Sequence, residues 1–258
     1  MQNTPKIPNR ITVHLGNPDQ KAKSVNVSFV DYIKNVSASE TYPIWPENAL
    51  RANIYSIVSF ALNRVYTEHY RGSGYDFDIT NSPEHDMKYN EKGLTYQNIS
   101  RIVDETFNDY VIRSGQNQPL IARYCSETEC NCPGLVRQGT VSLALEGKTP
   151  YQILQNYFGR DIEIVFNAPL VNDIKIYPGK ALKMGDSSPD VEEIQNQLQN
   201  ISVNYPTIPE IKNVDGAFDS DTLAAVKRFQ EIFDLDADGV VGKATWYRLK
   251  IIDVDLNR

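Results

Sequence analysis

The chain has 258 residues, a formal net charge of −7 and an apolar fraction of 41%, enough for one medium and one small domain with buried cores. Its acidic balance argues against a general nucleic-acid partner, because phosphate backbones are held by basic surfaces. No stretch reaches the roughly 18 apolar residues of a membrane span, and residues 1–10 show no apolar core of a secretory signal peptide.

Two short β-branched runs open the chain. Residues 11–13 and 25–27 alternate apolar and polar side chains as half-buried strands do, and they predict a hairpin. From Val30 the apolar period becomes helical, and Pro43 stops that helix because proline has no N–H to donate. The first domain is therefore expected to begin with a hairpin and a helix.

A second helix is expected to open at Pro46 and Glu47, since proline suits the start of a helix. Apolar side chains from Leu50 to Val65 surround most of this helix, which predicts a buried central helix. Residues 71–93 follow neither period, and they predict a long surface loop along one side of a cleft.

Shorter elements complete the first domain. Helical spacing returns over residues 99–110, and residues 120–124 predict a strand. Residues 143–158 predict two helices split at Gly147, and residues 162–165 predict a closing strand. Together these elements predict an α+β N-terminal domain.

Residues 167–179 combine Pro, Asn, Asp and Gly, and they are the best candidate for a linker, with a boundary near residue 175. Beyond it, Ser188 is a good N-cap and Pro189 suits the first helical position. The apolar spacing that follows predicts a helical second domain.

The three cysteines of the chain lie within eight residues, at Cys125, Cys130 and Cys132. An odd number allows one disulfide plus a free thiol, whereas the C-x4-C-x-C spacing also allows three soft ligands for zinc. The histidines are distant in sequence, so a fourth ligand cannot be identified. We expect no required cofactor, with zinc at the cysteines as the alternative.

A signature of glutamines at helical spacing, followed by Asp-Gly pairs, fills the second half of the chain. Taken singly, most of these residues are typical of helix cores and turns. Taken in order, they resemble the type 1 peptidoglycan-binding family, which implies a small three-helix domain over residues 177–252 that binds murein. The positions are Leu182, Gly185, Val191, Ile194, Gln195, Leu198, Asp215, Gly216, Phe218, Thr222, Ala225, Val226, Phe229, Gln230, Asp238, Gly239, Val240, Val241, Gly242, Thr245, Trp246 and Leu249.

One position departs from this family pattern. The family usually has Gly after the Phe of its second turn, whereas this chain has Asp219 after Phe218. Asp is one of the few residues that tolerate the left-handed conformation. We therefore expect Asp219 to adopt it.

The first half of the chain resembles the sporulation stage II protein D family, whose members are lytic transglycosylases and amidase enhancers. The resemblance rests on residues 27–40 and 46–53, continues weakly through residues 75–79 and 121–124, and reaches residues 134–140 and 149–154. It covers most of residues 10–165 and implies a domain over residues 10–170. Glu40 occupies the place of the catalytic glutamate of that family.

This role is chemically sensible for Glu40. The residue precedes an aromatic and proline stretch at residues 42–46, where partial desolvation would raise the pKa of its carboxyl and suit it to general acid catalysis. It would protonate the bridging oxygen of a glycan strand and help the C6 hydroxyl of the sugar attack C1, which gives an anhydro sugar. The plainer alternative is a solvated glutamate at a helix end.

Five further residues are candidates for contact with the sugar. Aromatic rings at Tyr42, Trp45 and Tyr75 can stack on sugar faces, although loop packing is the commoner role. Asn53 and Gln138 lie where the family carries polar cleft residues, but the local sequence is partly replaced there. Some family members bind zinc through Cys and His near this region, and here the cysteines remain without the local histidines.

Both resemblances imply a protein of the cell wall, spore or extracellular surface. Its expected partners are the glycan strands of peptidoglycan and, in addition, a wall amidase or other hydrolase. The resulting hypothesis is a lytic transglycosylase anchored to murein. The alternatives are a non-catalytic adaptor in a spore, phage-tail or surface assembly, and an amidase activator.

Overall fold

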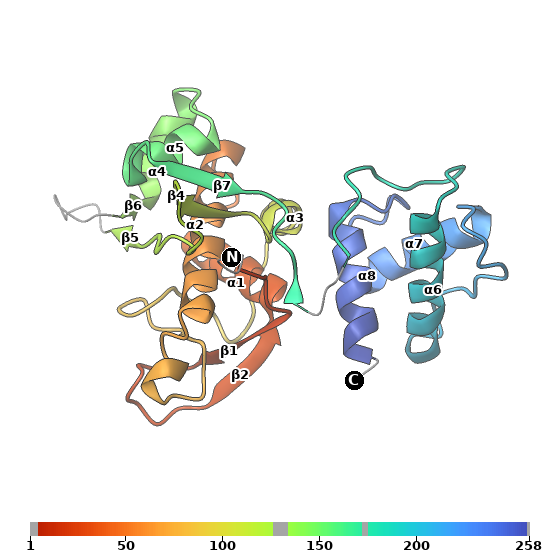
Figure 1. The fold of residues 1–258 in the computed structure, drawn as a ribbon, viewed down its shortest axis with the longest axis horizontal. Coiled ribbons are helices and arrows are strands. Elements are labelled where there is room, and N and C mark those ends of the chain that lie inside the picture. The colour runs from red at the N-terminus through yellow and green to blue at the C-terminus, as the bar shows by residue number, and fades with distance from the viewer. Residues whose placement is uncertain (1–4, 126–133, 172–174, 257–258) are drawn as a thin grey trace. The chain divides into compact units, whose positions relative to one another are not determined.

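The computed structural model describes residues 5–125, 134–171 and 175–256 (Figure 1). The chain divides into two compact units, Met1–Asp173 and Ile174–Arg258, each with buried apolar residues of its own. The first unit combines helices with small sheets, and the elements of the second are helices. The predicted fold class is therefore confirmed.

The predicted hairpin is also confirmed. Strand β1 (Arg10–His14) pairs antiparallel with β2 (Ser24–Ser28), and β3 (Ile79–Thr80) pairs in parallel with the other edge of β1. Ile11 and Val13 of β1 are fully buried, as the alternation along this strand requires.

Helix α2 is the central helix of the first unit. It spans Glu47–Tyr66, begins after Pro46, and buries 15 of its 20 residues, so the predicted buried helix is confirmed. Helix α1 (Phe29–Glu40) precedes it. The Ser28 hydroxyl caps α1 by accepting a hydrogen bond from the Asp31 backbone N–H at 3.0 Å.

Three more helices and a two-stranded sheet surround α2. Strand β4 (Tyr110–Arg113) pairs antiparallel with β7 (Ile162–Val165), which confirms the predicted closing strand. Helix α3 spans Gln97–Thr106, α4 spans Arg137–Leu145 and α5 spans Pro150–Phe158. Helix α4 starts six residues earlier than the expected helical segment, directly after a strand.

The strand predicted over residues 120–124 is wrong except at its end. Strand β5 is only Tyr124–Cys125, and it pairs in parallel with β6 (Leu135–Val136). Upstream of β5 the backbone bonds locally, because the N–H of Ala122 donates to the Leu120 carbonyl and that of Arg123 to the Ile121 carbonyl. These donors are consequently not available to a sheet ladder.

The expected loop over residues 71–93 is mostly irregular, as predicted. It contains the 3-10 helix η1 (Arg71–Ser73) and strand β3. One core cluster packs the first half of α2 with the β4–β7 sheet and α5, and it includes the following buried residues: Ala52, Tyr55, Val111, Ala122, Leu135, Ile153, Leu154, Phe158 and Ile162.

The second unit has three α-helices, α6 (Pro189–Asn204), α7 (Ser220–Ile232) and α8 (Lys243–Leu256). Ser188 is the N-cap of α6, as predicted, and its hydroxyl accepts from the Val191 N–H at 3.3 Å. Among the helices that the structure describes in either unit, none is long and apolar enough to cross a membrane.

A buried glutamine fastens the first Asp-Gly turn of the second unit. Gln195 is fully buried, and its side-chain oxygen accepts from the Gly216 N–H at 2.9 Å. Its side-chain nitrogen donates to the Ala217 carbonyl at 2.9 Å and to the Thr222 hydroxyl at 3.0 Å. One side chain therefore ties α6 to the turn and to the start of α7.

Gln230 repeats this arrangement at the second turn. Its side-chain oxygen accepts from the Gly239 N–H at 2.8 Å, and its nitrogen donates to the Val240 carbonyl at 3.0 Å and the Thr245 hydroxyl at 3.1 Å. Gly216 and Gly239 have φ angles of 75° and 77°, a region that glycine enters without a steric penalty. The sequence signature is thus a duplicated structural clamp.

Asp219 does not adopt the expected left-handed conformation. Its φ and ψ angles are −95° and −169°, and it is the N-cap of α7. The carboxylate accepts from the Thr222 N–H at 2.8 Å, and this hydrogen bond lowers the pKa of Asp219. Asp suits this position because it is a strong N-cap residue.

Candidate functional site

Glu40 is the last residue of α1, and its side chain is buried. The residue is only 7% exposed. The C-terminal end of a helix carries a partial negative charge, so a buried carboxylate there is unfavourable both through desolvation and through the helix dipole. Such a carboxylate requires compensating donors.

Two donors compensate the carboxylate of Glu40. The backbone N–H of Lys88 donates to Oε1 at 2.8 Å, and the guanidinium of Arg137 forms an ion pair with Oε2. Both oxygens therefore accept charge-assisted hydrogen bonds. The arrangement holds Glu40 as an anion at the junction of α1 and α4.

Arg137 is the first residue of α4 and is positioned by the strand pair that precedes it. Its guanidinium carbon lies 4.9 Å from the centre of the half-buried Tyr124 ring, a cation–π arrangement. Burial lowers the pKa of Arg137 and raises that of the Tyr124 hydroxyl. The Arg137 side chain is nevertheless 41% exposed, so it closes the solvent side of the Glu40 carboxylate.

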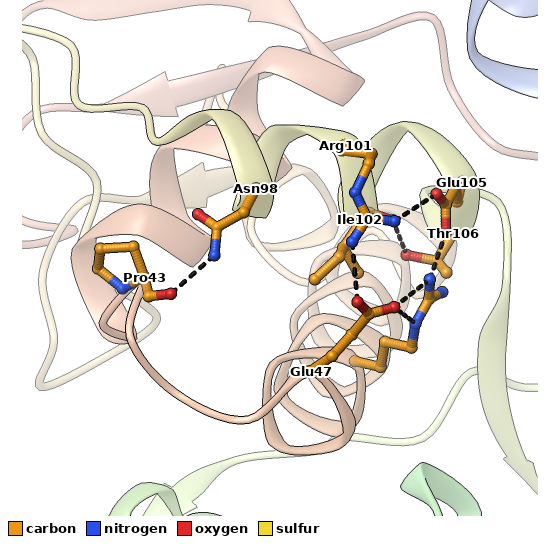
Figure 2. A network of polar contacts seen from close by, with 8 residues as sticks. Pro43, Glu47, Asn98, Arg101, Ile102, Glu105 and Thr106 are labelled. Carbon is orange, nitrogen blue, oxygen red and sulfur yellow. Dashed lines mark hydrogen bonds and ion pairs between the residues drawn. The ribbon is translucent and has the colours of Figure 1, made fainter.

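Local contacts fix the turn after Glu40. The N–H and hydroxyl of Thr41 both donate to the Ser37 carbonyl, at 3.0 and 2.7 Å. Further on, the Asn98 side chain of α3 donates to the Pro43 carbonyl at 2.7 Å (Figure 2). The segment that leaves α1 is therefore anchored at both ends.

An alternating network of charges links the first turn of α2 to α3 (Figure 2). Glu47 accepts from Arg51 and Arg101, each at 2.8 Å, and the same two arginines bind Glu105. The hydrogen bond from Arg51, followed by that from Arg101, lowers the pKa of Glu47 against the opposing effect of burial. This network keeps the loop that follows Glu40 against α3.

Asn53 braces the start of α4 and is fully buried. Its side-chain nitrogen donates to the Thr140 hydroxyl at 2.9 Å, and that hydroxyl donates to the Arg137 carbonyl at 2.6 Å. The described contacts of Asn53 are thus with the protein interior, beneath Arg137. Its predicted contact with a sugar stays a prediction.

Tyr42, Trp45 and Gln138 are the more accessible of the predicted sugar contacts. Tyr42 is 65% exposed, its ring lies 5.7 Å from that of the half-buried Trp45, and Gln138 is exposed beside Arg137 in the chain. Tyr42 and Trp45 close one turn, because the Trp45 N–H donates to the Tyr42 carbonyl. Two segments with predicted site residues are therefore joined through the Glu40–Arg137 pair.

Tyr75 belongs to a different part of the first unit. Its hydroxyl bonds Asp19, its ring packs on Tyr70 and Phe77, and it lines a cavity to which Glu40 does not contribute. The structure therefore does not bring Tyr75 together with the other predicted contacts.

The cysteine cluster lies at the edge of the described residues. Cys125 is disulfide-bonded, whereas Cys130 and Cys132 fall in residues 126–133, outside the described part of the chain. A disulfide sulfur is not a thiolate ligand, so this state of Cys125 agrees with the disulfide alternative. No group of three metal-ligating side chains occurs within the described residues, and the zinc alternative stays untested.

Sequence reasoning missed the partners of Glu40. Arg137 lies 97 residues away in the chain and Lys88 contributes only its backbone, so no local spacing could reveal them. The sequence does contain one signal of close packing near Arg137, namely the glycines at positions 134 and 139. A Cβ atom at Gly134 would lie 2.6 Å from the Arg123 carbonyl oxygen, and one at Gly139 would lie 2.2 Å from the Tyr157 hydroxyl.

Comparison with known proteins identifies the second unit. Residues 187–249 match the family model described as "Putative peptidoglycan binding domain". The second unit carries a peptidoglycan-binding domain. The clamp built on Gln195 and Gln230 lies within the matched residues.

A curated relative covers a similar share of the chain. It is the uncharacterized protein in the bpoA1 3′ region of Kitasatospora aureofaciens, and it is 41% identical over 68 residues. The match covers 26% of this chain and 53% of that protein, so the chain spans about half the length of this relative.

Two solved structures are also similar to part of the chain, each with 32% sequence identity and a TM-score of 0.25. One is the SleB N-terminal domain, where the match covers 29% of this chain and 93% of that one. The other is a peptidoglycan-binding protein from Clostridioides difficile in complex with glutamine hydroxamate, with 34% and 49% covered.

Proposed function

We propose that this chain is a cell-wall protein whose second unit holds it on peptidoglycan while its first unit cleaves glycan strands as a lytic transglycosylase. The family match over residues 187–249 carries the first part of this proposal. The buried carboxylate of Glu40 carries the second part. Anchoring raises the effective concentration of the first unit at its substrate, so weak binding of the glycan by the first unit suffices.

In this proposal Glu40 acts first as an acid and then as a base. The protonated carboxyl gives its proton to the bridging oxygen as the bond from C1 to that oxygen breaks. The resulting carboxylate then takes the proton of the C6 hydroxyl as that oxygen bonds to C1, so protons balance and an anhydro sugar forms. No water enters the product.

Glu40 can act as an acid only when Arg137 does not pair with its carboxylate. A general acid must carry a proton, whereas the guanidinium of Arg137 pairs with the carboxylate form. Because the Arg137 side chain is 41% exposed, a bound glycan can displace it towards solvent. The Glu40 carboxyl is then released from its ion pair and can carry the proton that a general acid needs.

The decisive test is product analysis with peptide-free glycan strands. The wild-type chain should release anhydro sugar fragments that mass spectrometry detects, and Glu40→Gln should abolish their release while co-sedimentation with sacculi is retained. Glu146→Gln is the matched control, because Glu146 is an exposed glutamate at the other end of α4, and it should keep the release. Absence of anhydro products from the wild-type chain would rule out this enzyme.

The same ion pair favours a second candidate function. A carboxylate whose two oxygens already accept hydrogen bonds is also suited to fix the α1–α4 junction. The chain would then be a non-catalytic adaptor of a spore, phage-tail or surface assembly, or an activator that contacts a wall amidase. In that case Glu40→Gln lowers the thermal stability of the first unit, and neither the wild type nor any variant releases anhydro products.

The anchor is tested separately by deletion of residues 175–258. The shortened chain should lose most of its co-sedimentation with purified sacculi, because the family match lies wholly inside the deleted part. Unchanged sedimentation would assign wall binding to the first unit instead.

A further inference from the structure

A cavity of about 320 Å³ opens in the first unit, apart from the Glu40 site. Basic and hydrogen-bonding side chains line it, among them Arg64, His69, His85 and Arg123, together with Tyr75 and the acidic Glu84. Of these, Arg64 alone is buried, at 3% exposure. The cavity therefore has a buried cation at its base and more accessible donors around it.

Two hydrogen bonds hold the guanidinium of Arg64 and leave one of its nitrogens without a partner. Its Nε donates to the Asp86 carboxylate at 2.8 Å and its Nη2 to the His85 carbonyl at 3.0 Å. Its Nη1 is buried and has no hydrogen-bond partner among the described residues. A buried N–H of a charged group without an acceptor costs on the order of 1–3 kcal/mol. Because this atom is enclosed by the protein, the contribution of Arg64 to the cavity is its positive charge and not this N–H.

The position of Arg64 is fixed by its surroundings. Its guanidinium carbon lies 4.9 Å from the centre of the Phe60 ring and 5.6 Å from that of Tyr70. Asp86 is itself occupied, since it also accepts from the Tyr70 hydroxyl at 2.7 Å and the Thr80 N–H at 2.8 Å. The positive charge of Arg64 is therefore held in a preformed position.

The charges around the cavity favour an anionic ligand that accepts hydrogen bonds. Arg123 is exposed, and its side chain has no hydrogen bond or ion pair within the described part of the chain. Burial and then the positive charge of Arg64 lower the pKa of His69, and Arg123 acts in the same direction while Asp86 opposes it. Glu84 is the acidic group of the lining, and it is exposed.

We propose that this cavity is an oxyanion site, which binds a carboxylate or phosphate group at the side chain of Arg123, beside the buried positive charge of Arg64. The planar guanidinium group is the protein donor best matched to such oxygens. The histidine rings and the Tyr75 face then surround the group that carries the anion. The site is argued from the first unit alone and does not depend on cleavage by Glu40.

The three histidines of the chain give a direct assay. The ring signals of His69 and His85 report from the cavity lining. The ring of His14 reports from elsewhere, because it is 6% exposed, bonds Gln20 and stacks on Phe77. Inorganic phosphate and N-acetyl-D-alanine are each titrated at constant pH, with chloride added to constant ionic strength, while proton NMR follows these signals.

We expect saturable shifts of His69 and His85 and no comparable shift of His14. Arg123→Gln should weaken the apparent affinity about tenfold, as loss of one charge-assisted hydrogen bond does, whereas Arg160→Gln removes an equal exposed charge elsewhere and should leave it unchanged. Arg64→Lys keeps the charge but loses the planar fork that fixes its position, and it should also weaken binding. Tighter binding of phosphate points to a phosphodiester polymer, and tighter binding of the carboxylate points to a peptide terminus.

The proposal fails if neither anion gives a saturable shift in the wild-type chain. It also fails if Arg123→Gln responds as the wild type does, or if His14 shifts in parallel with the other two rings. Because Arg123 is exposed, its variant is expected to fold, so the result stands even if Arg64→Lys is unstable.

Discussion

Buried polar side chains carry much of the specificity of this molecule at the scale of single residues. Gln195 and Gln230 each satisfy a glycine N–H and a threonine hydroxyl inside the second unit. An apolar residue of similar size would fill the same space but would leave those backbone groups without partners. The glutamines are therefore required by hydrogen bonding and not by volume.

Replacement of Gln195 by Ala should lower the free energy of unfolding of the second unit by about 2–4 kcal/mol, because it creates a small cavity and unsatisfied buried groups. Gln199 lies one turn further along α6 and is exposed, so Gln199→Ala should stay within about 0.5 kcal/mol. Urea unfolding reports this through Trp246 in a Trp45→Phe background, since these are the two tryptophans of the chain. Equal effects of both variants would contradict the clamp.

Glu193 links stability to pH in the same unit. Burial opposes its ionisation, but hydrogen bonds from Lys175 and the buried Lys250 together lower its pKa. A carboxyl with a lowered folded pKa stabilises the fold above its unfolded value, near 4.3, and loses this contribution as the pH falls through the folded value.

Glu193→Gln should therefore destabilise the protein at neutral pH by about 1–2 kcal/mol, and the difference from the wild type should shrink as the pH falls below about 4. Urea unfolding at several pH values measures this. The exposed Glu210 in the same unit has no such partners, so Glu210→Gln should follow the wild type at every pH. A deficit that persists at acidic pH would assign the effect to packing.

At the scale of elements, close approach between two helices explains the glycine at position 139. Helix α4 lies so near α5 that a Cβ atom at Gly139 would come within 2.2 Å of the Tyr157 hydroxyl. The same helix presents Arg137 to Glu40. Any displacement of α4 from α5 therefore also disturbs the candidate site.

Gly139→Ala should lower the unfolding free energy of the first unit by about 1–3 kcal/mol, which is typical of overpacking. Gly72→Ala is the control, because its added Cβ would meet only an ordinary contact of 3.9 Å with Glu68 and its backbone is not in the left-handed region. Scanning calorimetry compares the two variants. A neutral Gly139→Ala would mean that Tyr157 moves aside without cost.

Elements with strong local signals could be predicted from the sequence. The hairpin, the helix after Pro46 and the cap at Ser188 follow from alternation, proline and N-cap chemistry, which act within a few residues. The strand expected at residues 120–124 was wrong because local backbone turns, invisible in apolar spacing, take its donors. Asp219 was misjudged for a related reason, since Asp serves equally well as a cap.

Only one partner of the Glu40–Arg137 pair could be predicted from the sequence. Glu40 stands in a motif of continuous sequence, whereas the guanidinium that meets it comes from the far end of the same unit. Tyr75 was expected beside Glu40 and lines a separate cavity. Pairing of distant segments depends on the tertiary fold, which single-sequence patterns do not encode.

At the scale of the whole molecule, the chain consists of two compact units, Met1–Asp173 and Ile174–Arg258. The second unit has its own helix caps, turns and buried aromatic residues, including Trp246 at 0% exposure. Such a unit meets the usual conditions for independent folding.

Residues 174–258 expressed alone should therefore unfold cooperatively, with the same midpoint as the corresponding transition of the full chain. Thermal unfolding followed by the fluorescence of Trp246 measures both, again in a Trp45→Phe background for the full chain. A difference above about 4 °C, or roughly 1 kcal/mol for a domain of this size, would show that the first unit stabilises the second.

The Glu40–Arg137 pair has a consequence for biosynthesis. Glu40 is translated 97 residues before its counter-ion Arg137, and a lone carboxylate resists transfer out of water. The end of α1 should thus stay hydrated in the nascent polypeptide until α4 arrives. Burial of this carboxylate then becomes one of the last events in the maturation of the first unit.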